Sequence, residues 1–125
     1  MSDGVIPEDA RQFLLKNIDS IAQLEGLLVL RGDPGKAWDA AEVARHLYIG
    51  EAETTEILAR LAGRGLVGEA GGKYTYAPAT AELAAMVDQV ADLYSRYLIA
   101  VTQFIHARPK SRVQEFANAF RIRKD

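Results

Sequence analysis

The chain of 125 residues contains no cysteine, which excludes disulfide bonds and thiolate metal sites. It also has no apolar run approaching the roughly 18 residues that a membrane-spanning helix needs. Its start, MSDGVIPEDARQF, lacks the basic region and apolar core of a signal peptide. These absences fit a reducing compartment, and we expect a cytoplasmic location.

An excess of positive charge and recognisable catalytic motifs are also lacking. The net charge is −2, so no bulk positive field attracts nucleic acid. The two histidines, His46 and His106, have no ligand-type partners at metal-site spacing. No serine stands in a nucleophile-elbow context, and paired carboxylates such as Glu51 and Glu53 belong to a solvated helix end. We therefore predict no catalytic residue, metal site or cofactor, and no enzymatic activity.

What the chain does contain is enough apolar sequence, 49%, for one domain with a core. Residues 39–78 organise it, because their pattern predicts a helix, a turn, a second helix and a β-hairpin. Ala70-Gly71-Gly72 separates the two short β-type runs, and glycine suits a tight hairpin because it reaches positive φ without steric cost. The second helix has one apolar face, formed by Thr54, Ile57, Leu58 and Leu61.

The run from Ile57 to Val67 resembles the end of the recognition helix in bacterial winged-helix regulators, the MarR-like group among them. These proteins share the pattern L-x-x-L-x-x-x-G-L-V, and the resemblance covers roughly residues 18–78. It implies a winged helix-turn-helix, a role in transcription regulation and a dimer built from terminal helices. Because function sits in sites added to folds, the resemblance does not fix the partner.

Helices are also predicted before this stretch. Asp19 or Ser20 can cap a helix that starts at Ile21, and the pattern leaves open whether the preceding apolar run is a separate helix or part of one bent helix. Ala37-Trp38 is expected to supply a short first strand of the winged sheet, with Trp38 as a core residue.

A long helix is predicted at about 80–107, opened by Thr80 and ended by Pro109. Its apolar residues repeat in a heptad pattern that indicates a homodimer seam; the alternative is packing on the N-terminal helices of the same chain. A small ligand between the helices of a dimer is a further alternative. The seam candidates are Leu83, Val87, Val90, Tyr94, Tyr97, Val101 and Phe104.

The last part of the chain differs in charge from the rest. Residues 108–125 carry a net +4, whereas residues 1–107 carry −6. We predict a basic amphipathic tail at 109–125, with Phe116 and Phe120 on its apolar face, after a winged-helix domain at 1–108. The tail can pack on its own domain, dock on a partner protein or attach to an anionic membrane surface.

The recognition helix carries the wrong charges for a duplex. Glu51, Glu53 and Glu56 stand where the MarR-like pattern has basic or hydroxyl residues, so they would face phosphates. A first-turn acid favours the helix dipole, which explains why a helix tolerates them but does not make them DNA contacts. If DNA is bound nevertheless, the expected contacts are Arg45, Thr55, Arg60, Arg64 and Lys73.

We therefore predict a mainly α protein: a winged helix-turn-helix with a small β-hairpin wing, N-terminal helices and a long C-terminal helix. Its predicted function is a non-enzymatic regulatory module, homodimeric, that acts through protein contact at the acidic edge of the recognition helix and at the two tail phenylalanines. The alternative is a DNA-binding transcriptional regulator of the MarR-like type.

Overall fold

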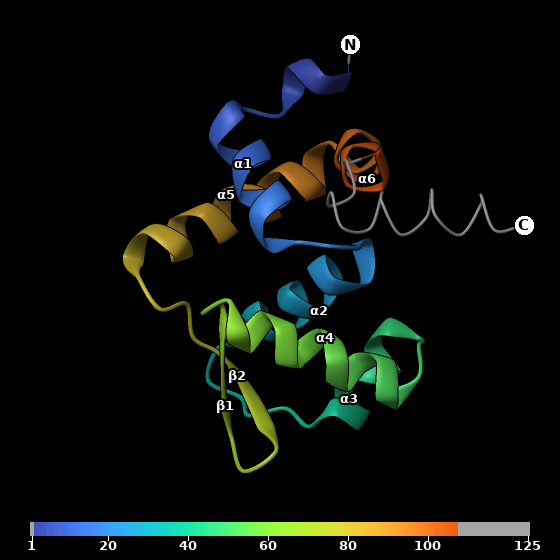
Figure 1. Cartoon of the computed structure of the whole chain (residues 1–125), viewed down its shortest axis with the longest axis vertical. Coiled ribbons are helices and arrows are strands. Elements are labelled where there is room, and N and C mark those ends of the chain that lie inside the picture. Colours follow the sequence, from blue (N-terminus) through green and yellow to red (C-terminus); the bar gives the residue numbers. More distant parts are fainter. Residues whose placement is uncertain (1, 108–125) are drawn as a thin grey trace, which may run out of the picture.

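The structure is a computed structural model that describes residues 2–107 (Figure 1). A short 3-10 turn precedes six helices and one hairpin in the described part, in the order of a winged helix-turn-helix. The elements are η1 (Ser2–Val5), α1 (Glu8–Asn17), α2 (Ile21–Arg31), α3 (Ala40–Leu47), α4 (Glu51–Gly63), β1 (Val67–Ala70), β2 (Lys73–Tyr76), α5 (Ala81–Arg96) and α6 (Leu98–Ala107).

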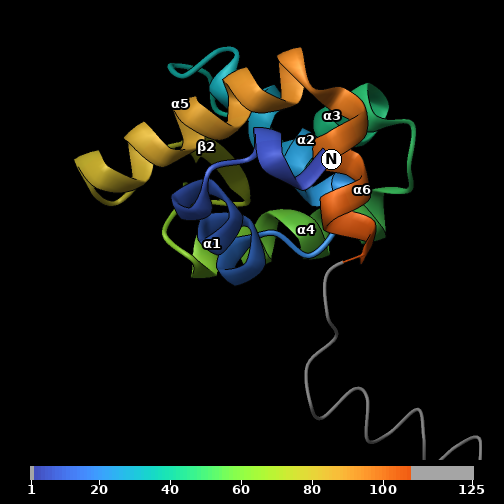
Figure 2. The same ribbon diagram turned by 90° about the horizontal axis from the view of Figure 1, so that it is seen from above.

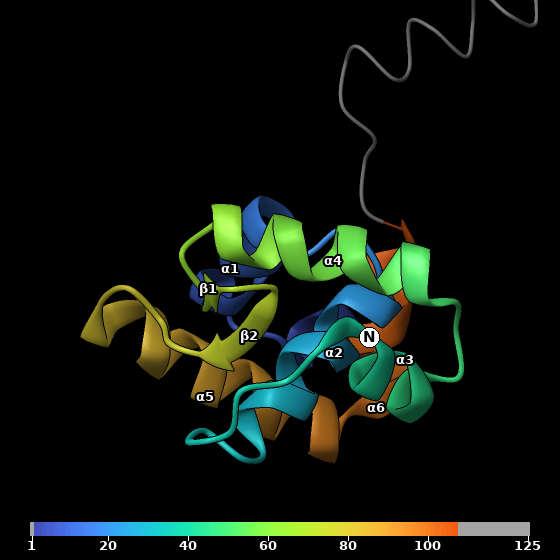
Figure 3. The same cartoon turned by 90° about the horizontal axis from the view of Figure 1, so that it is seen from below.

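The helix-turn-helix and the hairpin form where the sequence predicts them (Figure 3). Asp39 starts α3 with a capping box: its carboxylate accepts the Glu42 N–H at 2.8 Å, and the Glu42 carboxylate accepts the Asp39 N–H at 3.1 Å. Gly71 and Gly72 both have positive φ, 60° and 79°, as the tight turn between antiparallel strands requires. Local signals therefore set this part of the fold.

The segment before the helix-turn-helix contains two helices and a short extended stretch at Trp38. α1 and α2 are separate helices, and Ser20 caps α2 by accepting the Gln23 N–H at 3.1 Å. Trp38 contributes a single bridge to Tyr74, with both backbone hydrogen bonds at 2.8 Å, in place of a full first strand. The bridge holds the start of the helix-turn-helix against the hairpin.

The prediction of a single helix at about 80–107 is wrong, because the helix is interrupted at Tyr97. The backbone there has φ −129° and ψ 55°, so α5 ends at Arg96 and α6 starts at Leu98. Figure 2 shows α6 turning sharply away from the axis of α5. The break brings Val101 and Ile105, both buried, back onto the core, where α6 contacts η1 and α2. Burying this apolar area inside the chain offsets the helical hydrogen bonding lost at the break.

α2 is the centre of the core. It contacts α3, α4, β2 and α6, and its side chains Leu24, Leu27 and Leu30 are fully buried. α5 closes the other side by packing on α1, with Val87 and Val90 buried. The apolar face of the winged domain is thus covered from both ends of the chain.

A tyrosine in α5 makes the stability of the fold depend on alkaline pH. Burial raises the pKa of Tyr94 to about 12, and the Glu25 carboxylate, which accepts its hydroxyl proton at 2.8 Å, adds to the shift. Between the ordinary value of about 10 and that raised value, the unfolded chain loses a proton that the fold keeps, so the free energy of unfolding falls as pH rises.

Tyr94→Phe should therefore be less stable than wild type near pH 8, since it lacks the bond to Glu25, and the difference should shrink as pH approaches the raised pKa. Urea denaturation of both proteins at several pH values from about 8 to about 11.5 measures it. A difference that stays constant over this range would contradict the raised pKa of Tyr94.

Candidate functional site

The start of α4 carries an acidic edge, formed by Glu51, Glu53 and Glu56, and all three side chains are exposed. They point outward because the opposite face of the helix is buried through Thr54, Ile57 and Leu58. Glu51 and Glu53 lie in the first turn, where the positive end of the helix dipole favours them. The sequence thus placed these carboxylates correctly on the solvent side of the second helix.

The far end of α4 is basic, but its charge is largely used inside the chain. Arg64 donates to Gln23 Oε1 at 2.9 Å, to Asp19 Oδ2 at 3.1 Å and to the backbone carbonyl of Asn17. Arg60 reaches the same Asp19 oxygen at 3.4 Å from a side chain that is 61% exposed. Arg64 therefore joins α4 to the junction of α1 and α2, whereas Arg60 stays mostly in solvent.

The other candidates for DNA contact are exposed. Arg45 lies at the end of α3, and Lys73 lies at the tip of the hairpin. Thr55 is exposed on α4, and its hydroxyl donates to the Glu51 carbonyl at 3.0 Å. Across the hairpin turn, Glu69 accepts the Gly72 N–H at 3.1 Å, which holds one wing carboxylate on the backbone.

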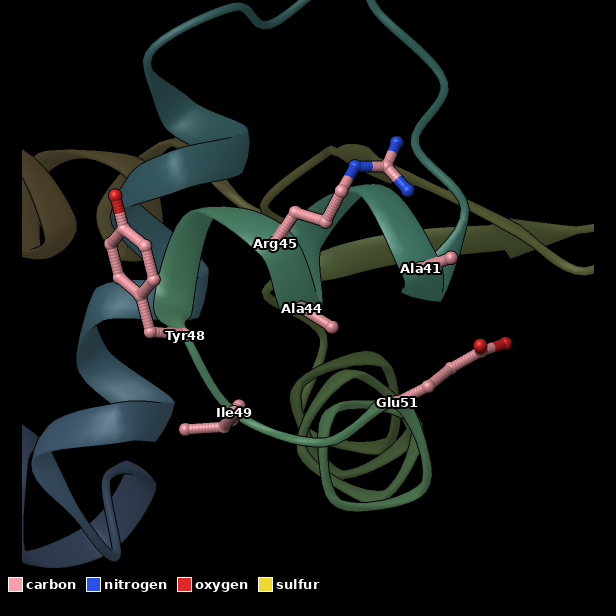
Figure 4. A pocket seen from close by; sticks show the side chains of 6 residues that line it. All are labelled: Ala41, Ala44, Arg45, Tyr48, Ile49 and Glu51. Atoms are coloured by element: carbon pink, nitrogen blue, oxygen red, sulfur yellow. The ribbon is translucent and has the colours of Figure 1, made fainter.

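The turn between the two helices displays an unexpected aromatic side chain. Tyr48 is 93% exposed and has φ 58°, in the left-handed region. Beside it, α3 and the start of α4 enclose an open hollow of about 600 Å³ with a mainly apolar lining. Figure 4 shows Arg45 and Tyr48 extending from the end of α3 and Glu51 from the start of α4, with Ala41, Ala44 and Ile49 also lining the hollow.

A second, more polar hollow of about 310 Å³ lies on the outer face of α3. Lys36 stands over the Trp38 ring, 3.9 Å from its centroid, and pairs with Glu42 at 3.3 Å. The pKa of Glu42 lies below its ordinary value because of the hydrogen bond with the Asp39 backbone and the nearby lysine. His46 packs edge-on against Trp38 with ring centroids 5.2 Å apart, which is a structural role.

The predicted dimer seam is split by the break at Tyr97. Of its members, Val87, Val90 and Val101 are buried within the chain, while Leu83, Tyr94 and Phe104 are half-buried. Tyr97 is exposed, and with Leu98 and Ile99 it forms an apolar corner between α5 and α6, with exposed fractions of 41%, 50% and 68%. Part of the seam thus packs within its own chain.

Several predictions lie outside this surface. Phe116, Phe120 and the rest of the basic tail fall outside the described residues. Within residues 2–107, no cluster of three or more histidine or carboxylate side chains could hold a metal ion. Over the same range, no helix is long and apolar enough to span a membrane.

Sequence reasoning missed two features of this surface. Asp19, considered only as a helix cap, is the carboxylate that engages both Arg60 of α4 and Arg64 just after it. Tyr48 lies in the turn predicted between the two helices, and this position was the available signal for an exposed side chain. No sequence signal indicated the contacts of Arg64, because they join residues more than 40 positions apart.

Comparison with known proteins supports the fold. No family model matches the chain, and no curated protein matches its sequence. Among solved structures, the crystal structure of a MarR family transcriptional regulator from Silicibacter pomeroyi is similar, with a TM-score of 0.53 and 19% sequence identity. The match covers 94% of this chain and 81% of that chain. It confirms the predicted winged-helix fold, and at this identity it shows the fold alone.

Proposed function

We propose that this chain is a non-enzymatic winged-helix regulator of transcription that contacts DNA through α4 and the hairpin. The observation that carries the proposal is the fold match along 94% of the chain to a MarR family transcriptional regulator. The exposed helix and hairpin lie in the order that winged-helix proteins use for a duplex. The function predicted first from the sequence, action mainly through contact with a protein, has no comparable support from the likeness.

The charges of the surface set the expected strength of DNA binding. Arg45, Arg60 and Lys73 are exposed cations that can reach phosphates, and Thr55 is an exposed hydroxyl. The three glutamates of the acidic edge oppose them, since each repels the phosphates and releases no counterion. We therefore infer weak binding at physiological salt, with a shallow salt dependence set by a few phosphate contacts.

Removing the acidic edge should strengthen DNA binding. For the variant Glu51→Gln, Glu53→Gln, Glu56→Gln, we expect affinity for a mixed-sequence duplex to rise about tenfold at about 50 mM salt, and less at about 200 mM. Three exposed repulsions of about 0.5 kcal/mol each would account for this factor. Fluorescence anisotropy of a labelled duplex measures both affinities.

The matched control removes the same charge elsewhere. Glu8, Glu82 and Asp92 are exposed acids on α1 and α5, and their amide variants change the net charge equally. We expect at most a twofold change for this control, because these acids lie on α1 and α5 rather than on α4 or the hairpin, and exposed charges are screened by salt over about 10 Å. An equal gain in both variants, or no binding by either, would remove α4 as the DNA-facing element.

A second candidate is contact with a basic protein surface through the same edge. Its specific support is that Arg64, one of the two arginines near the end of α4, is engaged by Asp19 and Gln23, so the free surface of the helix is mainly acidic. Carboxylates arranged along one helix face favour a partner of opposite charge. Failure of the variant Glu51→Gln, Glu53→Gln, Glu56→Gln to bind DNA would support this second function.

We also infer a homodimer, for which the exposed apolar corner of Tyr97, Leu98 and Ile99 offers a contact surface. Apolar side chains clustered on a surface mark association sites more often than isolated ones do. A cytoplasmic location and a membrane contact through the tail remain proposals from the sequence.

A further inference from the structure

Tyr48 ends α3 in the left-handed backbone conformation, where its own N–H and the Ile49 N–H both donate to the Ala44 carbonyl. A non-glycine residue in the left-handed region costs roughly 1–2 kcal/mol, and glycine or asparagine is usual at this position after a helix. The side chain is also 93% exposed, so its burial does not offset the cost of the backbone conformation. Strain of this kind on an exposed turn favours a role in contact with another group.

The neighbourhood of Tyr48 defines the chemistry of that group. The hollow of about 600 Å³ has Ala41, Ala44 and Ile49 in its lining, which offer an apolar surface, and its charged lining residues are Arg45 and Glu51. The acidic edge of α4 begins beside it at Glu51 (Figure 4). An aromatic side chain, an apolar surface and a row of carboxylates together fit a segment with apolar side chains flanked by cations.

Such a segment is present in the chain itself. We propose that residues 108–125 dock on this hollow, with Phe116 and Phe120 against Tyr48 and the apolar lining, and with their cations along the acidic edge of α4. The segment carries a net +4, and its two phenylalanines are four positions apart in the sequence. The body that it meets is net acidic, at −6.

The connection is long enough for this contact. α6 and α3 both pack on α2, whose 11 residues span about 16 Å. Residues 108–115 can bridge up to about 26 Å when extended, so Phe116 can reach the turn from the end of α6. Figure 1 shows α6 and the α3–α4 turn on the right of the molecule, with α6 nearer the top, and the start of α5 on the left. Figure 3, turned by 90°, shows the end of α6 and the turn again on the right.

Docking within one chain needs little affinity. A short tether gives an effective concentration in the millimolar range, so a contact of modest strength is populated. The docked segment would cover the first turn of α4 and place cations over its carboxylates. The contact of the segment with the hollow does not depend on whether α4 binds DNA or protein, and the experiment below involves neither.

Cysteine pairs provide the test, because the chain has no cysteine of its own. In the full chain, Ala52→Cys is combined with Ala117→Cys, which joins the exposed start of α4 to the apolar face of the segment. The matched control combines Ala85→Cys, an exposed alanine on α5, with the same tail cysteine. We expect the first pair to form its disulfide at least tenfold faster at low micromolar concentration, since a disulfide requires Cα atoms within about 7 Å.

Further variants separate docking from other causes. Each rate is divided by the reactivity of the same thiols toward a small disulfide reagent, which removes differences in thiol pKa. Adding Phe116→Ala and Phe120→Ala to the first pair should slow its closure at least fivefold, and so should the three glutamine substitutions of the acidic edge. Normalised rates within threefold of the control would overturn the proposal, and so would a bridge formed mainly between two chains.

Discussion

Replacing Arg64 with alanine is expected to lower the free energy of unfolding by about 2–3 kcal/mol. The guanidinium donates to Gln23 Oε1, to both carboxylate oxygens of Asp19 and to the Asn17 carbonyl, and the Gln23 side chain is only 2% exposed. Removing it takes one donor from several acceptors at once, and hydrogen bonds to charged groups are among the stronger ones. Urea denaturation should show a lower midpoint with an unchanged slope.

Arg60→Ala is the matched control for this experiment. Arg60 shares the Asp19 carboxylate, but its side chain is 61% exposed and its contact with Asp19 is 3.4 Å long. Such surface pairs contribute about 0–1 kcal/mol, so we expect a change below about 0.5 kcal/mol. Arg64→Lys should be intermediate, because one ammonium cannot reproduce the planar fork. Equal effects of the two alanine variants would mean that Arg64 does not hold α4 to α1 and α2.

The role of Arg64 also bears on function. The sequence offered it as a candidate for DNA contact, beside Arg60, because both follow the recognition-helix pattern. In the structure the two arginines differ, since only one is surrounded by acceptors from the α1–α2 junction. A helix pattern gives the face on which a side chain lies, but not the partners that another part of the chain brings to it.

The parts of the fold that the sequence predicted correctly are those with local causes. Asp39 and Glu42 form a capping box from four neighbouring residues, and Gly71-Gly72 supplies the two positive φ angles of the hairpin. The apolar face of α4 was equally readable, because helical spacing alone places Ile57, Leu58 and Leu61 together. Each of these signals lies within one element, so no knowledge of the tertiary contacts was needed.

The break at Tyr97 had no comparable signal. No proline or glycine lies between residues 81 and 107, and the heptad pattern runs through the break without interruption. The same apolar residues satisfy a straight helix with a partner and a broken helix folded onto its own core. Tertiary packing decides between them, through the contacts of α6 with η1 and α2. In the candidate site, too, local sequence could not predict the contacts, because the partners of Arg64 come from a distant part of the chain.

Val101→Asp distinguishes these two arrangements with a large effect. Val101 is fully buried in α6, so an aspartate there should lower the free energy of unfolding by about 3–5 kcal/mol. Small domains are stable by only about 5–15 kcal/mol, so a loss of this size would unfold a large fraction of the molecules. Urea denaturation followed by circular dichroism measures the loss. If Val101 instead belonged to a seam between two chains, the variant would stay folded and sediment as a monomer.

Ile99→Asp supplies the matched comparison two residues away. Its side chain is 68% exposed at the corner between α5 and α6, so stability should change by less than about 0.5 kcal/mol. If the corner of Tyr97, Leu98 and Ile99 is the dimer contact, the variant should sediment as a folded monomer where the wild type sediments as a dimer, because a carboxylate in an apolar contact loses its hydration. A wild-type dimer that Ile99→Asp leaves intact would place the contact elsewhere, and the three buried valines of the heptad pattern would still be explained by packing within one chain.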